Sequence, residues 1–315
     1  QQPNLQDLYV SYRFLQHKIR TGGYFVGFGN PNLKPEQTTA YEVGVARQLG
    51  DKARIDVTAY YKDVKDLVEI TNVPSFPNSF SSYRNRDFAT IKGVDIGYTT
   101  RKVNNVSASI NYSLSYAQGT GSVSNSQGNI AWTASDPPKQ TAPLDFDQRH
   151  KLSLNMDWSL GKGQGMTWGK WHPFEDVGIN LLYNVGSGTP YTPTGVYNEV
   201  TLANVNSSPI GPLNSRYGPW TSNLDLKASR GFNLGGTKLS ASLLVLNVLN
   251  AKNANGVYTG TGSAFTTGWL NTEDGQSFIS NTADKNGEAL YNLSQNNPNI
   301  YSNPRLVRFG IRANF

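Results

Sequence analysis

The chain has 315 residues, of which 37% are hydrophobic, and 28 Lys and Arg against 22 Asp and Glu give a formal net charge of +6. No run approaches the ~18 consecutive apolar residues of a membrane-spanning helix, so a helical membrane protein is excluded. The basic residues are scattered without interleaved stacking aromatics, so nucleic-acid binding is not expected, and the absence of cysteine excludes disulfides, thiol catalysis and thiolate metal sites.

Turn-forming residues are abundant. The chain has 31 Gly, 16 Pro and 17 Tyr. Glycine supplies positive φ angles, proline fixes φ, and tyrosine packs well on a pleated sheet. This composition predicts an all-β chain with many turns.

Apolar and polar residues alternate with a period of two in about nine segments, each near the ~9–11 residues that a tilted strand needs to cross a bilayer. The segments are 40–48, 54–66, 90–100, 105–116, 151–160, 177–186, 222–230, 237–250 and 305–315. In 105–116 the apolar set is Val106, Ala108, Ile110, Tyr112, Leu114 and Tyr116, and serines and Asn111 occupy the other face. We therefore predict β-strands with one apolar and one polar face.

The connections differ systematically in length. Those at 50–53, 102–105 and 234–237 are tight, whereas the alternate ones at 69–87, 117–148, 187–221 and 251–303 are long. The exception is 161–176, which falls on the short side yet is longer. A soluble sandwich or propeller has no reason to sort its loops in this way, but an outer-membrane barrel has short periplasmic turns and long extracellular loops. The pattern favours a transmembrane antiparallel β-barrel.

Charges on the polar faces agree with a barrel. Asp56, Asp95, Asp157 and Asp225 alternate with small polar residues. Ionisable groups would be very costly in a dry sandwich core, whereas a hydrated lumen accommodates them. An ordinary solvent face would also explain the alternation, but not the sorted loops. An aromatic girdle at the membrane interfaces is predicted from Trp158, Trp168, Trp171 and Tyr183.

Several segments, in this order along nearly the whole chain, resemble the TonB-dependent outer-membrane transporters of Gram-negative bacteria. They are GNPNLKPEQTTAYEVGV at 29–45, IDVTAYYKDVKDLV at 55–68, IKGVDIGY at 91–98, DFDQRHKLSLNMDW at 145–158, GSGTPYTPT at 186–194, LVLNVLNAKN at 244–253 and the closing RLVRFGIRANF. The combination looks most like the large members with a carboxypeptidase-regulatory-like domain, including Oar-like receptors.

The resemblance implies a 22-stranded barrel around an N-terminal plug, of which this chain would supply the C-terminal strands. Residues 1–30 are then the end of an upstream strand and an outer loop, and 31–315 are the C-terminal barrel strands. The plug, the segment that engages TonB and the signal peptide would lie upstream. The alternative is a natural split barrel completed by another chain.

The last segment carries a further implication of the resemblance. Its alternating apolar residues are similar to the signal that the barrel-assembly machinery reads on its clients, and the residues concerned are Val307, Phe309, Ile311 and Phe315. We expect this segment to be the closing strand, which must pair with the first strand to remove the sheet edge.

Catalysis and metal binding have no support in the sequence. His17, His150 and His172 are dispersed. Asp145 and Asp147 beside Arg149 and His150 could suggest a calcium site, but an ion-paired hinge between loop and strand is the preferred interpretation. We expect no enzyme activity and no cofactor.

Binding and passage remain. The predicted substrate contacts are loop aromatics, which suit a glycan, a peptide or a small molecule such as a chelate, although packing between loops explains them equally well. They are Tyr191, Tyr197, Trp220, Tyr258 and Trp269. The leading functional hypothesis is TonB-dependent transport across the outer membrane.

Three other functions stay open: a structural or adhesive surface barrel, a passive pore and a soluble carbohydrate-binding protein. The leading hypothesis places the long loops outside the cell and the C-terminus in the periplasm. The expected partners are the lipid bilayer with lipopolysaccharide, TonB and the barrel-assembly machinery.

Overall fold

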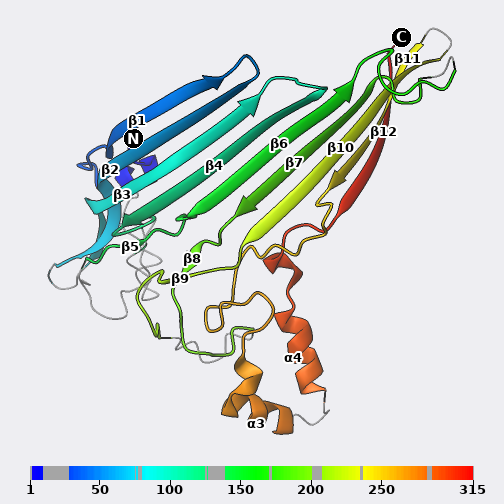
Figure 1. Ribbon diagram of the computed structural model, residues 1–315. Helices are drawn as coiled ribbons and strands as arrows, with labels where there is room; N and C mark the ends of the chain where they lie inside the picture. The colour runs from blue at the N-terminus through cyan, green and yellow to red at the C-terminus, as the bar shows by residue number, and fades with distance from the viewer. Residues whose placement is uncertain are drawn as a thin grey trace.

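The computed structural model describes residues 2–9, 28–74, 76, 80–124, 126, 139–169, 172–200, 208–234, 237–281 and 286–314 (Figure 1). A curved antiparallel sheet of ten strands dominates these residues. No helix within these ranges has the length and apolar character needed to cross a membrane.

Nine strands of the sheet follow one another in chain order, and each overlaps a predicted segment. They are β1 (Gln37–Leu49), β2 (Ala53–Val73), β3 (Phe80–Thr100), β4 (Val106–Gly119), β6 (His150–Leu160), β7 (Val177–Gly186), β10 (Thr221–Leu234), β11 (Thr237–Leu246) and β12 (Leu306–Asn314). The short β5 (Ala142–Pro143) pairs with β4. In this chain the sheet is open, with β1 and β12 at its edges.

The longer connections contain elements that the sequence pattern did not predict. β8 (Pro190–Tyr191) and β9 (Arg216–Tyr217) pair with each other, and α1 (Leu5–Tyr9) precedes the sheet. The connection before β12 contains η2 (Trp269–Asn271), α3 (Glu273–Asn281), α4 (Gly287–Gln295) and η3 (Pro298–Ile300). Of residues 1–30, the structure describes α1 with its neighbours and residues 28–30, where Phe28 bridges Ser82.

Three predicted long connections, β4–β6, β7–β10 and β11–β12, lie at one end of the strands, and the three predicted tight turns lie at the opposite end (Figure 1). We call the end with the connections β1–β2, β3–β4, β6–β7 and β10–β11 the turn end, and the opposite end the loop end. The residues between β6 and β7, the predicted exception, lie at the turn end. The C-terminal end of β12 is also there (Figure 1).

The prediction of a long loop at 69–87 is wrong. β2 and β3 are 21 residues each, and they pair as far as Val73 and Phe80. The register shifts between Val64 and Val68, and Asp66 has a φ of 60°. This bulge breaks the period of two, so the sequence pattern ends there although the hairpin continues.

The hairpin beyond the bulge is stabilised by its own small core. Val68, Ile70 and Tyr83 are buried together, and Leu33 packs against them. Asn30 Nδ2 donates to the Tyr83 carbonyl over 2.9 Å, so the NPNLKPE segment is held along the outer part of β3. A tilted strand needs about 9–11 residues to cross a bilayer, so these two strands are about twice the length that a crossing requires.

In-register pairing separates an apolar face from a polar one over the whole sheet. One transverse row consists of Tyr98, Ile110, Leu154, Tyr183 and Leu224. The adjacent row consists of Gly97, Asn111, Ser153, Asn184 and Asn223. Because successive side chains of a strand point to opposite faces, these rows lie on opposite sides of the sheet.

An arginine in place of Ile110 should destabilise the folded protein far more than one in place of Ser107 on the same strand. Ile110 lies in the apolar row, where charge near the bilayer midplane costs about 2–4 kcal/mol. Ser107 is on the polar face and pairs with Asp157, which an arginine could contact. Denaturant unfolding of the full polypeptide in lipid vesicles, followed by tryptophan fluorescence, measures both effects. Equal destabilisation by the two variants would contradict the assignment of the faces.

Candidate functional site

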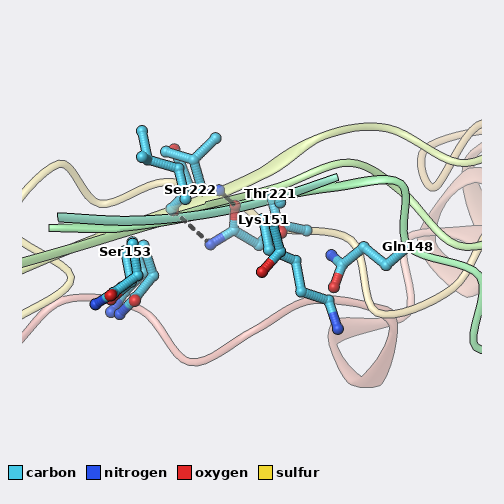
Figure 2. A pocket seen from close by; sticks show the side chains of 13 residues that line it. Gln148, Lys151, Ser153, Thr221 and Ser222 are labelled. Atoms are coloured by element: carbon cyan, nitrogen blue, oxygen red, sulfur yellow. Dashed lines mark hydrogen bonds between the residues drawn. The ribbon is translucent and has the colours of Figure 1, made fainter. Parts of the chain in front are cut away.

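A groove of about 390 Å³ crosses the polar face of the sheet near its loop end. Its floor comes from β4, β6, β7 and β10, and loop residues Gln148 and Asn253 complete its wall. Figure 2 shows Lys151 and Gln148 toward one end of the groove and Ser153 toward the other.

Two transverse rows of side chains form the floor. The outer row, nearer the loop end, is Ser113, Lys151, Gly186 and Thr221. The inner row is Asn111, Ser153, Asn184 and Asn223. The rows lie two residues apart along each strand, or about 7 Å, and four strands side by side span about 14 Å. The result is a shallow polar surface of the size of a small ligand.

Some polar groups of the groove are already engaged and fix its shape. Asn253 donates from Nδ2 to the Ser222 carbonyl over 2.7 Å and accepts from its N–H over 2.8 Å (Figure 2). Gln148 Nε2 donates to the Ser187 carbonyl over 2.7 Å. Ser113 Oγ donates to Asp95 Oδ1 over 2.5 Å. These bonds hold loop and strand side chains around the floor.

Other polar groups of the groove remain open. Lys151, Ser153, Asn184 and Thr221 form no side-chain hydrogen bond or ion pair with any other residue that the structure describes. Together they offer an ammonium group, a carboxamide and two hydroxyl groups. The groove therefore combines a fixed wall with a free set of donors and acceptors.

The DQRH segment, residues 147–150, builds the rim beside the groove. Asp147 is 1% exposed, and its carboxylate accepts from the Ala117 N–H over 2.8 Å and from the Tyr217 hydroxyl over 2.5 Å. The guanidinium of Arg149 lies 4.7 and 4.8 Å from the ring centroids of Tyr217 and Tyr116. Arg149 Nε also lies 3.5 Å from Asp147, which confirms the predicted ion-paired hinge.

The contacts at this rim shift the pKa of Tyr217. Burial and the hydrogen bond to Asp147 raise the pKa of the Tyr217 hydroxyl to about 12. The phenol therefore remains a donor to Asp147 over the whole physiological range. The network ties β9, in the connection before β10, to the beginning of β6.

Two glycines of the GSGTPYTPT segment allow close packing at this rim. A Cβ atom on Gly186 would collide with the Gln148 carboxamide, and one on Gly188 would collide with the backbone of Gly218. Ser187, between them, accepts from the His150 N–H over 3.1 Å. The segment thus fits the DQRH rim because it lacks side chains at these two positions.

The Asn-rich segment at 247–253 borders the groove on the side of β10. Asn247 and Asn250 have positive φ angles of 52° and 51°. Asn250 Oδ1 accepts from the Arg305 N–H over 3.0 Å, next to the start of β12. Asn247 N–H donates to Asp225 Oδ1 over 2.8 Å. The segment turns the chain after β11 and brings Asn253 to the groove.

A buried charge cluster lies at the loop end of β2 and β3. Lys139 Nζ is 2.6 Å from Glu69 Oε2, 2.8 Å from Asp87 Oδ1 and 2.9 Å from the Arg86 carbonyl. Arg86 Nε lies 3.4 Å from Glu69, and Thr120 Oγ1 donates to Asp87 over 2.7 Å. Glu69 is 1% exposed. Lys139 thereby anchors the long β4–β6 connection to the β2–β3 hairpin.

The predicted substrate-contacting aromatics lie in and beside the two long connections that precede β10 and β12, and two of them are packed within their own connection. Tyr258 is buried and donates to the Gln295 carbonyl over 2.6 Å, and Trp269 packs on Tyr291 with ring centroids 5.0 Å apart. Both therefore help to pack the connection that contains α3 and α4. Tyr191 lies in β8, and Tyr197 lies in the same connection between β7 and β10.

Trp220 lies on the apolar face. Its ring stacks on His150 at 5.5 Å, and the His150 ring lies 6.2 Å from that of Tyr112. Since Thr221 belongs to the polar row, the preceding residue points to the other face. This stack has the composition of a membrane-interface girdle near the loop end.

The structure describes only some of the residues that were predicted to form the aromatic girdle and the barrel-assembly signal. Trp158 lies on the apolar face of β6, paired with Val106 and Ile179, and Trp168 is exposed at the turn end. Tyr183 lies in the central apolar row. Val307, Phe309 and Ile311 project from β12 and are exposed. Trp171 and Phe315 lie outside the described residues.

Comparison with known proteins identifies the family to which this chain is similar. The sequence profile described as "TonB dependent receptor-like, beta-barrel" matches residues 1–253. A curated relative, the vitamin B12 transporter BtuB of Vibrio vulnificus, is 36% identical over 73 residues, which are 23% of this chain and 11% of the relative.

Solved structures agree in fold. The outer membrane transporter YddB from Escherichia coli has a TM-score of 0.50 at 15% identity, over 71% of this chain and 30% of its own. The FpvAI–pyocin S2 complex has a TM-score of 0.52 at 14% identity, over 90% of this chain and 27% of the matched one. The fold is that of a transmembrane antiparallel β-barrel, and the chain spans less than a third of either protein.

Burial of Glu69 should make the folded protein less stable as the pH rises. Burial, with a hydrogen bond to Asp87, raises the pKa of Glu69 from 4.5 to about 7 although Lys139 opposes the shift. Between these values the folded protein binds more protons than the unfolded chain, so this contribution to stability is fully present below pH 4.5 and is lost as the pH rises through 7. Denaturant unfolding of the full polypeptide in lipid vesicles should give a free energy of unfolding about 1–3 kcal/mol lower at about pH 8 than at about pH 5.

Two variants of the full polypeptide provide the control for this measurement. Glu69→Gln should remove the pH dependence. Glu175→Gln should retain it, because Glu175 lies at the turn end, where it accepts from the Gly163 N–H. A free energy of unfolding that is the same at both pH values in the unsubstituted protein would contradict the raised pKa of Glu69.

Proposed function

Because this chain belongs to the family of TonB-dependent receptors, we propose that it forms the C-terminal wall of a plugged outer-membrane barrel that takes up a substrate with energy transmitted through TonB. The groove carries this proposal. A polar, partly unsatisfied surface on the inner wall, close to the loop end, suits a substrate that enters between the loops.

The two faces of the sheet have separate roles in this proposal. The apolar rows contact the bilayer and its lipopolysaccharide, and the polar rows line the hydrated lumen. The loop end is extracellular, and the turn end, with the end of β12, is periplasmic. The separation of long and short connections supports this orientation.

A substrate that enters from outside first meets the loops. In the connection with α3 and α4, the rings of Trp269 and Phe278 pack against the buried Tyr291. Glu199 accepts from the Thr259 and Gly260 N–H groups over 3.3 and 3.2 Å. These contacts join the two long connections beside the groove. Ordered loops beside a polar groove can hold a ligand until the plug, which is expected upstream, is rearranged. The curated relative, named for a vitamin, supports a scarce nutrient as substrate.

The exposed edge strand β12 supports a second protein partner besides TonB. Phe309 is 83% and Ile311 is 80% exposed, and β12 pairs only with β11 among the described strands. An exposed apolar strand edge needs a partner during assembly. We assign this role to the barrel-assembly machinery before β12 meets the first strand of the barrel.

Transport predicts that uptake of at least one compound depends on both this gene and TonB. Mass spectrometry of spent medium compares the parent strain with strains lacking either gene. The parent should deplete a compound that both deletion strains leave behind, because energised passage needs the receptor and TonB together.

Re-expression of the gene is the control and should restore depletion. Uptake that depends on the gene but persists without TonB would contradict energised transport and indicate a passive pore. Loss of the protein without any change in uptake would favour a structural or adhesive surface barrel.

A further inference from the structure

The charge of the groove is determined by one residue. Among the thirteen described residues that line it, Lys151 is the single charged one, and no Asp or Glu is among them. Asp95, the nearest carboxylate along the outer row, lies beyond Ser113 and is hydrogen-bonded to it. Asp225, which accepts from Asn223 over 2.9 Å, lies one row further from the loop end. Lys151 therefore has no ion-pair partner among the described residues and presents its positive charge on the polar face.

The open groups around Lys151 form a convergent donor set. Thr221 shares the outer row with Lys151, and Ser153 and Asn184 are adjacent to each other in the inner row. Hydrogen bonds between an ionised donor and an anionic acceptor are roughly twice as strong as those between neutral groups. A ligand with an anionic group at Lys151 and oxygen acceptors about 7 Å away matches both rows.

The walls argue against two other ligand classes. The lining includes no aromatic ring among the described residues, so stacking cannot provide the affinity that neutral sugars usually obtain from it. A cationic ligand would face Lys151 without a carboxylate to pair with. Charge and hydrogen bonds are therefore the directional interactions that this groove offers.

We propose that the groove binds an oxygen-rich anion, with a carboxylate against Lys151 and hydroxyl or carbonyl oxygens against Ser153, Asn184 and Thr221. The proposal rests on the proposed function, in which this face lines the lumen. The floor of about 14 Å matches a short acidic oligosaccharide or another polyhydroxy acid of similar length.

Calorimetry on the complete receptor, purified in detergent, tests this ligand class. The probes are trigalacturonate, an acidic trisaccharide, and maltotriose, a neutral one. Trigalacturonate should bind saturably and more weakly as salt is added, since an exposed ion pair is screened. Lys151→Met should weaken this binding at least about tenfold, because the variant loses a charge-assisted contact.

Lys227→Met is the matched control. Lys227 lies on the same polar face, six residues along β10 from Thr221 and outside the groove lining. This variant should change trigalacturonate affinity less than about twofold, because the charge that it removes lies far from the site and is screened. Maltotriose should bind much more weakly than trigalacturonate to the unsubstituted receptor.

Three outcomes would overturn the proposal: no saturable binding of trigalacturonate, equal binding of maltotriose, or equal loss of affinity in the two lysine variants. The first would indicate that another part of the polypeptide covers the groove. Binding in detergent requires neither TonB nor transport. A receptor that supports TonB-dependent uptake but fails this test would therefore refute the ligand class and leave the transport function in place.

Discussion

In-register backbone pairing is the constraint on which the rest of the structure depends. A slip of one residue in any strand would move its apolar side chains to the polar face. Nine consecutive strands keep one register from the turn end to the loop end, and the shifts in β2 occur only at its outer part. The two faces are therefore continuous, and four polar residues from four strands can align into one row of the groove.

The rim converts this regular sheet into a shaped site. Asp147 joins a strand, β4, to a loop segment, β9, through the Ala117 N–H and the Tyr217 hydroxyl. Its neighbour Gln148 lies over Gly186 and forms the wall of the groove. Burial of a carboxylate requires such complete hydrogen bonding. The same residues that satisfy the buried charge thus position the polar groups that a ligand would meet.

The sequence predicted the nine strands and the loop sorting, because alternation with a period of two and turn residues are local signals. It did not predict the outer half of the β2–β3 hairpin, where the bulge at Asp66 interrupts the alternation. Lys151 and Thr221 were missed because they form a row only through the register of separate strands. The loop aromatics were the stronger local signal for a binding site, yet Tyr258 and Trp269 pack within a loop. The sequence could not show this, because contacts between distant segments leave no periodic pattern.

Residue-by-residue accessibility along β6 tests the central claim that one face meets lipid and the other meets water. The chain has no cysteine, so single cysteines from Leu152 to Ser159 can carry spin labels in the receptor reconstituted in lipid. We predict a period of two, in which oxygen dissolved in lipid relaxes labels at Leu152, Leu154 and Met156, and a water-soluble nickel chelate relaxes labels at Ser153 and Asn155. Accessibility of both sets to the aqueous reagent would contradict the account.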